Sequence, residues 1–225
     1  MAFEVLDEHE QGELVQKWLR ENAMSIAIGI ALGLLLIFGW QQWKVHRVRQ
    51  AAEAATQYQA LLDAVNAKRN DDATTIAEAL RKQFPDTAYA AFASMRAAEV
   101  NTSKGDLKAA ATDLEWAQEH AEVPALKALA AINLARIKLG QNEAEAALKL
   151  VDALPKGDYA ALAGELRGDI LVKLARNDEA RAAYQEALGK LEPQAPNRSF
   201  VQMKLDNLAA TPVPAAAATK ESSGS

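Results

Sequence analysis

The sequence predicts an all-α protein in which a single transmembrane helix near the N-terminus is followed by a solenoid of helical repeats. Three observations support this prediction. Residues that favour helices dominate the 225-residue chain, which holds only 11 glycines and 7 prolines. One stretch near the start carries no charge, and the rest of the chain is interrupted by short breaks at regular intervals.

Composition excludes several kinds of function. The chain has no cysteine, so disulfide bonds and cysteine-based metal sites are impossible. Its net charge is −5, which gives no general attraction to nucleic acid. The histidines, His9, His46 and His120, lie in separate segments. No phosphate-binding glycine loop, zinc-protease motif or nucleophile elbow is present, so we expect a non-enzymatic protein without cofactor, metal or catalytic residues.

Residues 22–43 form the predicted transmembrane helix. These 22 residues carry no charge and include nine Ile, Leu or Phe residues. As a helix they span roughly 33 Å, enough for a bilayer core of about 30 Å. Trp18, Trp40 and Trp43 lie where an interfacial aromatic belt is expected. A buried core helix is the alternative, but the stretch has no polar face. A cleaved signal peptide fits less well, because the preceding residues are acidic and 40–43 is a poor cleavage site.

The charges that flank this helix bear on its orientation. Lys44, Arg47 and Arg49 follow it, whereas only Lys17 and Arg20 precede it closely. The positive-inside rule, counted literally, therefore places the C-terminal domain in the cytoplasm by a margin of one residue.

Gly29 and Gly33 form a GxxxG pattern within the apolar stretch. Such small residues let membrane helices approach closely, so the two glycines are candidates for membrane helix packing. Chance is the alternative, since glycine is common in membrane helices.

The remainder of the chain predicts a succession of helices of about 12 to 18 residues. The helix predicted from Arg49 to Lys68 is expected to continue the membrane helix outward. Pro85 ends one helix, and turn or capping residues mark the other boundaries. The predicted breaks are residues 70–72, 84–87, 104–106, 123–124, 140–142, 155–158, 175–178 and 192–197.

Small and large residues recur at a spacing typical of tetratricopeptide repeats. In each set a small residue is followed four residues later by a large one, and that residue is followed three residues later by a second small one. Successive sets lie 36 and 34 residues apart. In this alignment Gly105 lies at a turn and Gly168 in a first helix. An irregular Ala-rich bundle is the alternative. The sets are Ala110, Leu114 and Ala117; Ala146, Leu150 and Ala153; Ala180, Tyr184 and Ala187, with a degenerate set at Ala73, Ala77, Leu80 and Pro85.

The predicted organisation is an acidic N-terminus at 1–21, a membrane helix at 22–43, a tetratricopeptide-like domain at 44–209 and a disordered tail at 210–225. A last helix over 199–209 is expected to cap the solenoid, because each repeat buries its face only against a neighbour. The tail has no core-forming residues.

A solenoid offers a groove lined by the first helix of each pair. The mixed charge and the Met and Phe side chains favour adaptable contacts with a protein partner. The residues expected to face this groove are Phe92, Met95, Glu99, Lys138, Glu165, Asp169 and Lys173.

Three stretches together resemble the YfgM-like family, the ancillary subunits of the bacterial SecYEG translocon. They are WLRENAMSIAIGIALGLLLIFGWQQW at 18–43, DYAALAGELRGDILVKLARNDEARAAYQEAL at 158–188 and VQMKLDNLA at 201–209. The resemblance covers nearly the whole chain up to Ala209, whereas the tail has no counterpart.

The resemblance implies a bacterial inner-membrane protein with a cytoplasmic N-terminus and a periplasmic repeat domain. It implies association with the SecYEG translocon, with membrane lipid and with PpiD, a membrane-anchored periplasmic chaperone of the prolyl-isomerase type. The implied activity is to pass newly translocated client proteins to periplasmic chaperones. A second implied role is restraint of a stress-response regulator through the N-terminus. The implied orientation opposes the literal count of flanking charges.

Two other readings remain open at this point. The same anchor and repeats would suit a cytoplasm-facing adapter for assembly of another membrane complex. They would also suit a structural homo-oligomer held together through Gly29 and Gly33.

Overall fold

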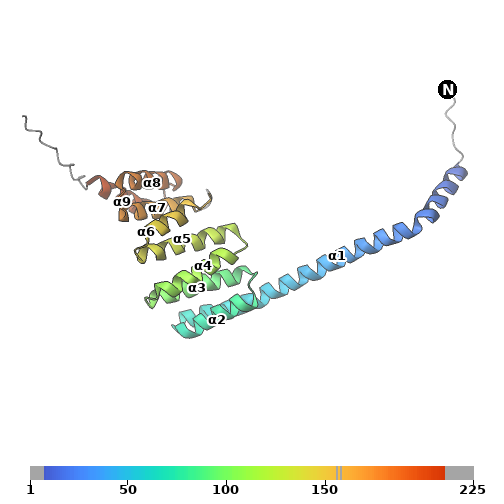
Figure 1. Cartoon of the computed structure of the whole chain (residues 1–225), viewed down its shortest axis with the longest axis horizontal. Coiled ribbons are helices and arrows are strands. Elements are labelled where there is room, and N and C mark those ends of the chain that lie inside the picture. Colours follow the sequence, from blue (N-terminus) through green and yellow to red (C-terminus); the bar gives the residue numbers. More distant parts are fainter. Residues whose placement is uncertain (1–7, 156, 158, 211–225) are drawn as a thin grey trace, which may run out of the picture. The chain divides into compact units, whose positions relative to one another are not determined.

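The computed structural model describes residues 8–155, 157 and 159–210, and this part of the chain contains helices and no strand (Figure 1). The chain divides into two units, residues 1–52 and 53–225. The first helix contributes to both units. The helices are α1 Glu8–Asn66, α2 Asn70–Gln83, α3 Ala88–Ser103, α4 Leu107–His120, α5 Pro124–Gly140, α6 Ala144–Asp152, α7 Ala160–Lys173, α8 Asn177–Lys190 and α9 Arg198–Ala210.

The first unit is the apolar part of α1. Within the described residues, the segment Val15–Asn66 of this helix is the one long and apolar enough to cross a membrane. Its apolar side chains face outward: Leu36 is 75% exposed and Phe38 is 65% exposed. Outward-facing apolar side chains do not fit the core-helix alternative. The helix runs without interruption to Asn66, as predicted for the residues that follow the membrane stretch.

The second unit is a stack of helix pairs. We call the first helices of the pairs, which are residues 53–66 of α1 and helices α3, α5 and α7, the A layer. We call the second helices, α2, α4, α6 and α8, the B layer. In Figure 1 the helices follow one another along the stack from α2 to α9. Helix α3 packs on both α2 and α4, and α5 packs on both α4 and α6, so each pair buries its apolar face against the next.

The turn inside each pair has the same hydrogen-bonding pattern. One residue adopts a left-handed conformation at each turn: Lys68, Gly105, Asn142 and Ala175, with φ of 57°, 79°, 64° and 59°. The next amide donates to a carbonyl five residues earlier, as Asp106 N does to Asn101 O at 2.9 Å and Glu143 N does to Lys138 O at 2.9 Å. This is the Schellman motif, which ends a helix and starts the next within three residues.

These turns give the true alignment of the repeats. Counting five residues on from each left-handed residue gives Ala73, Ala110, Ala147 and Ala180, all no more than 1% exposed. The predicted first and third sets follow this alignment. The predicted middle set is wrong by one residue, because Ala147 is fully buried and Ala146 is only half-buried. Adjacent alanines made the two alignments equally good in the sequence.

Two further expectations are corrected. Helix α6 has nine residues, fewer than the predicted 12 to 18. The break placed at residues 70–72 lies just before them, since Asn70 begins α2. Other boundary residues act as expected. The Thr87 and Asp106 side chains accept hydrogen bonds from the backbone amides of Ala90 and Ala109, and Pro124 begins α5.

Helix α9 covers the end of the stack. Val201 is fully buried and Leu208 is 8% exposed, and both belong to the core that α7 and α8 form. The Arg198 guanidinium donates to Leu188 O at 2.8 Å and to Leu191 O at 3.1 Å, which satisfies free carbonyls at the end of α8. Residues 211–225, where a disordered tail was predicted, lie outside the described residues.

Candidate partner-binding surfaces

Helix α5 borders two clefts on opposite faces of the stack. At about 100° per residue, Leu134 and Lys138 share one side of the helix and Asn133, Arg136 and Ile137 share the other. The first set lines a cleft between α4 and α6, and the second lines a cleft between α3 and α5. We call them the B-layer cleft and the A-layer cleft.

The A-layer cleft has a volume of about 430 Å³. Leu114 of α4 lies at its floor, and Met95 supplies a flexible apolar wall. Arg136 donates to Asn133 Oδ1 at 3.2 Å on one rim, and Arg96 pairs with Glu99 on the other. The lining residues are Met95, Ala98, Glu99, Thr102, Ser103, Leu114, Asn133, Arg136 and Ile137.

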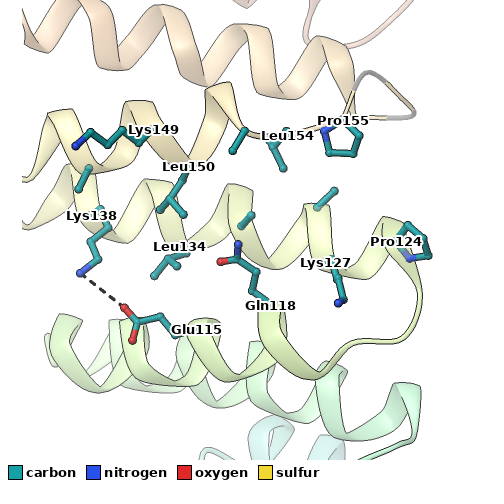
Figure 2. Close-up of a pocket in the computed structure, with 14 residues that line it drawn as sticks. Glu115, Gln118, Pro124, Lys127, Leu134, Lys138, Lys149, Leu150, Leu154 and Pro155 are labelled. Atoms are coloured by element: carbon teal, nitrogen blue, oxygen red, sulfur yellow. Dashed lines mark ion pairs between the residues drawn. The ribbon is translucent and has the colours of Figure 1, made fainter.

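The B-layer cleft is larger, about 760 Å³ (Figure 2). In Figure 2, Leu134 and Leu150 point into the space between α5 and α6, while Gln118 reaches toward it from α4. The Lys138 ammonium lies 3.8 Å from a Glu115 oxygen and 3.2 Å from a Glu143 oxygen. The lining residues are Glu115, Gln118, Pro124, Lys127, Ala128, Ala131, Leu134, Lys138, Ala146, Lys149, Leu150, Ala153, Leu154 and Pro155.

A buried ion pair fixes the helices beside the A-layer cleft. Asp113 of α4 accepts hydrogen bonds from Arg81 of α2 at 2.7 Å and Asn101 of α3 at 2.8 Å. Burial raises the pKa of the Asp113 carboxyl, and together with a smaller repulsion from Glu78 it outweighs the opposing effects of Arg81 and Asn101. Sequence reasoning missed this cluster, since nothing in the residue order relates positions 81, 101 and 113.

A second polar cluster holds α9 on α7 and α8. The Lys204 ammonium lies 2.8 Å from Glu165 Oε1 and 2.7 Å from Asp169 Oδ2, and the Tyr184 hydroxyl donates to Asp169 Oδ1 at 2.7 Å. Burial lowers the pKa of Lys204, but the bonds and charges of Asp169 and Glu165 together outweigh burial and raise it. Burial and the Asp169 carboxylate both raise the pKa of Tyr184.

The structure separates the residues that were expected to share one groove. Met95 and Glu99 line the A-layer cleft, whereas Lys138 lines the B-layer cleft. Glu165 and Asp169 bond to Lys204 of α9.

The last two of these residues lie elsewhere. Phe92 is half-buried, with its ring 6.1 Å from that of Tyr58, and Lys173 is exposed at the end of α7. A role in partner binding stays a prediction for all seven.

The two membrane-packing candidates lie on an open part of α1. Nothing lies within 4 Å of a Cβ placed on Gly29 or Gly33. Their role in helix packing therefore also stays a prediction. Across the described residues, no group of three or more His, Cys, Asp or Glu side chains is arranged to hold a metal ion.

Helix pairs stacked into a solenoid, with a cleft on each face, define a helical-repeat protein of the solenoid class. The family model described as a tetratricopeptide repeat-like domain matches residues 16–210. The chain therefore belongs to this tetratricopeptide repeat-like family, within the group whose curated members are named ancillary SecYEG translocon subunits. This finding confirms the resemblance seen in the sequence.

Several curated relatives carry that name, and three of them show the extent of the similarity. The protein of Escherichia coli strain K12 is 31% identical over 202 residues, which cover 90% of this chain and 97% of the relative. The Haemophilus influenzae protein is 28% identical over 92% of this chain and 100% of its own length. The Neisseria gonorrhoeae protein is 28% identical over 85% of this chain and 89% of its own length.

A solved structure supports the fold alone. It is a crystal structure from Podosopora anserina, described as a candidate kinesin light chain with nearly identical tetratricopeptide-like repeats. Its TM-score is 0.56 at 12% identity, and the match covers 71% of this chain and 87% of that one.

Proposed function

We propose that this protein is a membrane-anchored, non-enzymatic scaffold of the Sec translocon. One observation carries the proposal: the chain matches a protein named ancillary SecYEG translocon subunit over 97% of that protein's length. Because the alignment covers nearly the whole of both chains, a common partner is the simplest expectation.

The anchor gives the scaffold a physical advantage. A single membrane helix confines the repeats to the bilayer surface and raises their effective concentration near other membrane proteins. Modest affinity in the clefts then suffices for association. We further propose that the repeats lie on the periplasmic side, where they would bind newly translocated clients and pass them to chaperones such as PpiD.

The A-layer cleft is the surface proposed for clients. Met95 and Ile137 offer apolar contacts that adapt to many side chains, and the Arg96–Glu99 pair lies at the exposed rim. Restraint of a stress-response regulator by the N-terminus is proposed from family resemblance, and residues 1–7 of that segment lie outside the described residues.

Co-purification tests the association with the translocon. Tagged SecYEG from mild-detergent extracts should retain the full-length chain. A chain lacking residues 1–43 should be folded, soluble and absent from the eluate. If the truncated chain is retained equally well, the repeats rather than the anchor make the principal contact. If the full-length chain is absent, the proposal is wrong.

The flanking charges favour a second candidate, a cytoplasm-facing adapter. Lys44, Arg47 and Arg49 outnumber Lys17 and Arg20, and basic residues concentrate on the cytoplasmic side of membrane helices. The two candidates differ in the side of the membrane that the repeats occupy.

The glycine pair is tested separately. Replacing Gly29 and Gly33 together by isoleucine should weaken any contact built on that face of α1, and Ala23 and Ala27 replaced by isoleucine serve as the matched control. If translocon association and oligomeric state both survive the glycine change, that face has no packing role.

A further inference from the structure

The third helix pair differs from the others in the length of its second helix. Helix α6 has nine residues, whereas α2, α4 and α8 have 14 each. At 1.5 Å per residue, α6 is therefore about 13 Å long and its counterparts about 21 Å. Its partner α5 is 17 residues long, so α6 can cover only about half of the length of α5, whereas α4 on the other side is a full-length B-layer helix.

The B-layer cleft lies where α6 ends. The residues Ala153, Leu154 and Pro155, just beyond the helix, form one wall, and Gln118 of α4 lies opposite. A second cavity of about 140 Å³ shares Pro124, Ala128, Leu154 and Pro155 with the first, so the hollow extends toward Tyr159. The hollow therefore begins where α6 ends and lies beside the residues that follow this helix.

The floor of this cleft is apolar and formed largely by small residues. Ala128, Ala131 and Leu134 of α5 line the cleft and are buried. Leu150 and Leu154 project into it from the side of α6 (Figure 2). Alanine leaves space that longer side chains of a partner would fill. An apolar trough of this kind receives the apolar face of an amphipathic helix.

The rim is positively charged. Lys127, Lys138 and Lys149 surround the cleft, and Lys138 already lies near the carboxylates of Glu115 and Glu143. Lys127 and Lys149 make no ion pair with any residue that the structure describes, and both are exposed. Charge complementarity therefore favours a partner that carries carboxylates beside its apolar side chains.

We propose that the B-layer cleft binds a short, acidic amphipathic helix of a partner protein, which continues the B layer where α6 stops. Apolar side chains of the partner enter the trough between α4 and α6, and its carboxylates approach Lys127 and Lys149. This surface lies on the face of α5 opposite the cleft proposed for clients, so a partner and a client can bind together. The inference goes beyond the association with the translocon and does not depend on it.

A defined peptide tests the proposal on the full-length protein in nanodiscs of zwitterionic lipid. The probe is a fluorescein-labelled helical peptide of about 14 residues, with leucines on one face and glutamates flanking them. Fluorescence anisotropy, corrected with empty nanodiscs, measures binding. Saturable binding with Kd below about 100 μM is expected, and its absence up to about 1 mM overturns the proposal.

Variants locate the site. Lys127→Glu with Lys149→Glu should weaken binding about tenfold or more, because two attractive contacts become repulsive. Lys82→Glu with Lys190→Glu, the same charge change at exposed positions elsewhere, should alter Kd less than about twofold. Ala146→Trp should fill the cleft and also weaken binding. Equal weakening by both double variants would mean that only bulk charge matters, which overturns the proposal.

Two control peptides separate charge from shape. A peptide with lysine in place of glutamate should bind the native chain poorly and recover on the Lys127→Glu, Lys149→Glu variant. A peptide with serine in place of leucine should not bind, since it has nothing to place in the trough. If the serine peptide binds as tightly as the leucine peptide, the cleft does not bind apolar side chains and the proposal fails.

Discussion

The ring of Tyr184 lies directly against the bare Cα of Gly168. A Cβ placed on this glycine would lie 2.7 Å from Tyr184 Cζ and closer still to Cε1 and Cδ1. The glycine therefore lets α7 and α8 approach closely enough for the Tyr184 hydroxyl to reach Asp169. The repeat pattern in the sequence predicts both places: Gly168 in the first helix of a pair, and Tyr184 at the large position of the second helix.

Gly168→Ala should destabilise the protein. The added methyl group has no room beside a ring that is 2% exposed, so the free energy of unfolding should fall by about 1–3 kcal/mol. Urea unfolding measures this change. Gly189→Ala is the control: nothing lies within 4 Å of a Cβ there, so alanine should leave stability unchanged or raise it by about 0.5–1 kcal/mol. Equal effects at both sites would contradict the close contact.

Lys204→Met should loosen the cap helix α9. It leaves Glu165 and Asp169 half-buried without their cation, which should cost about 2–3 kcal/mol in unfolding free energy near neutral pH. Because the folded state raises the pKa of Lys204 above 10.5, the stabilisation is fully present below pH 10.5 and is lost as the pH rises through the raised pKa.

The matched control for Lys204 is Lys190→Met, an exposed lysine on α8. It should change stability by less than about 0.5 kcal/mol. Hydrogen exchange of α9 amides gives a local measurement: exchange should accelerate in the Lys204 variant and stay unchanged in the control. If the Lys204 variant is as stable as the native chain, the contacts of Lys204 with Glu165 and Asp169 do not stabilise the position of α9.

Asp113 should make stability depend on pH in the direction opposite to an ordinary ion-paired carboxylate. Its raised pKa means that the folded state takes up a proton before the unfolded state, whose pKa is near 3.8. The stability of the native chain relative to Asp113→Asn should therefore increase as the pH falls from neutral toward 3.8, and level off below it. If the relative stability decreases instead, Arg81 dominates and the pKa of Asp113 is lowered.

Substitutions at two of the left-handed turn residues should change stability in opposite directions. Ala175 adopts φ 59°, which costs a residue with a Cβ about 1 kcal/mol, so Ala175→Gly should raise the free energy of unfolding by roughly that amount. Gly105→Ala introduces the same cost at φ 79°, so this variant should lower the free energy of unfolding by a similar amount. Guanidinium unfolding of the two variants and the double variant checks this prediction. Effects of the same sign would contradict the common turn geometry.

The class of fold could be predicted because its signals are local. A long uncharged stretch, helix-forming residues and regular breaks each need only a short window of sequence. The alignment of the third repeat was less accessible. Alanine occupies both 146 and 147, and the left-handed turn there uses Asn142 rather than glycine. The conformation of the turn, which the sequence does not show, decides between the two.

The surfaces were harder to predict than the fold. Lys138 lies four residues from Leu134 and shares its side of α5, so a one-residue shift in alignment moves it from one face of the stack to the other. Glu165 and Asp169 resembled free groove residues until α9, almost 40 residues later, placed Lys204 between them. Contacts between helices that lie far apart in the chain depend on tertiary packing, and a short stretch of sequence does not show that packing.

The central claim is that the repeats lie on the exit side of the translocon, and the side of the membrane they occupy tests it most directly. A tag inserted after Ala209 should be cleaved by protease in spheroplasts and protected in inverted inner-membrane vesicles. That result would place the repeats in the periplasm, despite the one-residue excess of positive charge after the anchor. Cleavage in inverted vesicles alone would contradict the claim and make the cytoplasm-facing adapter the correct account.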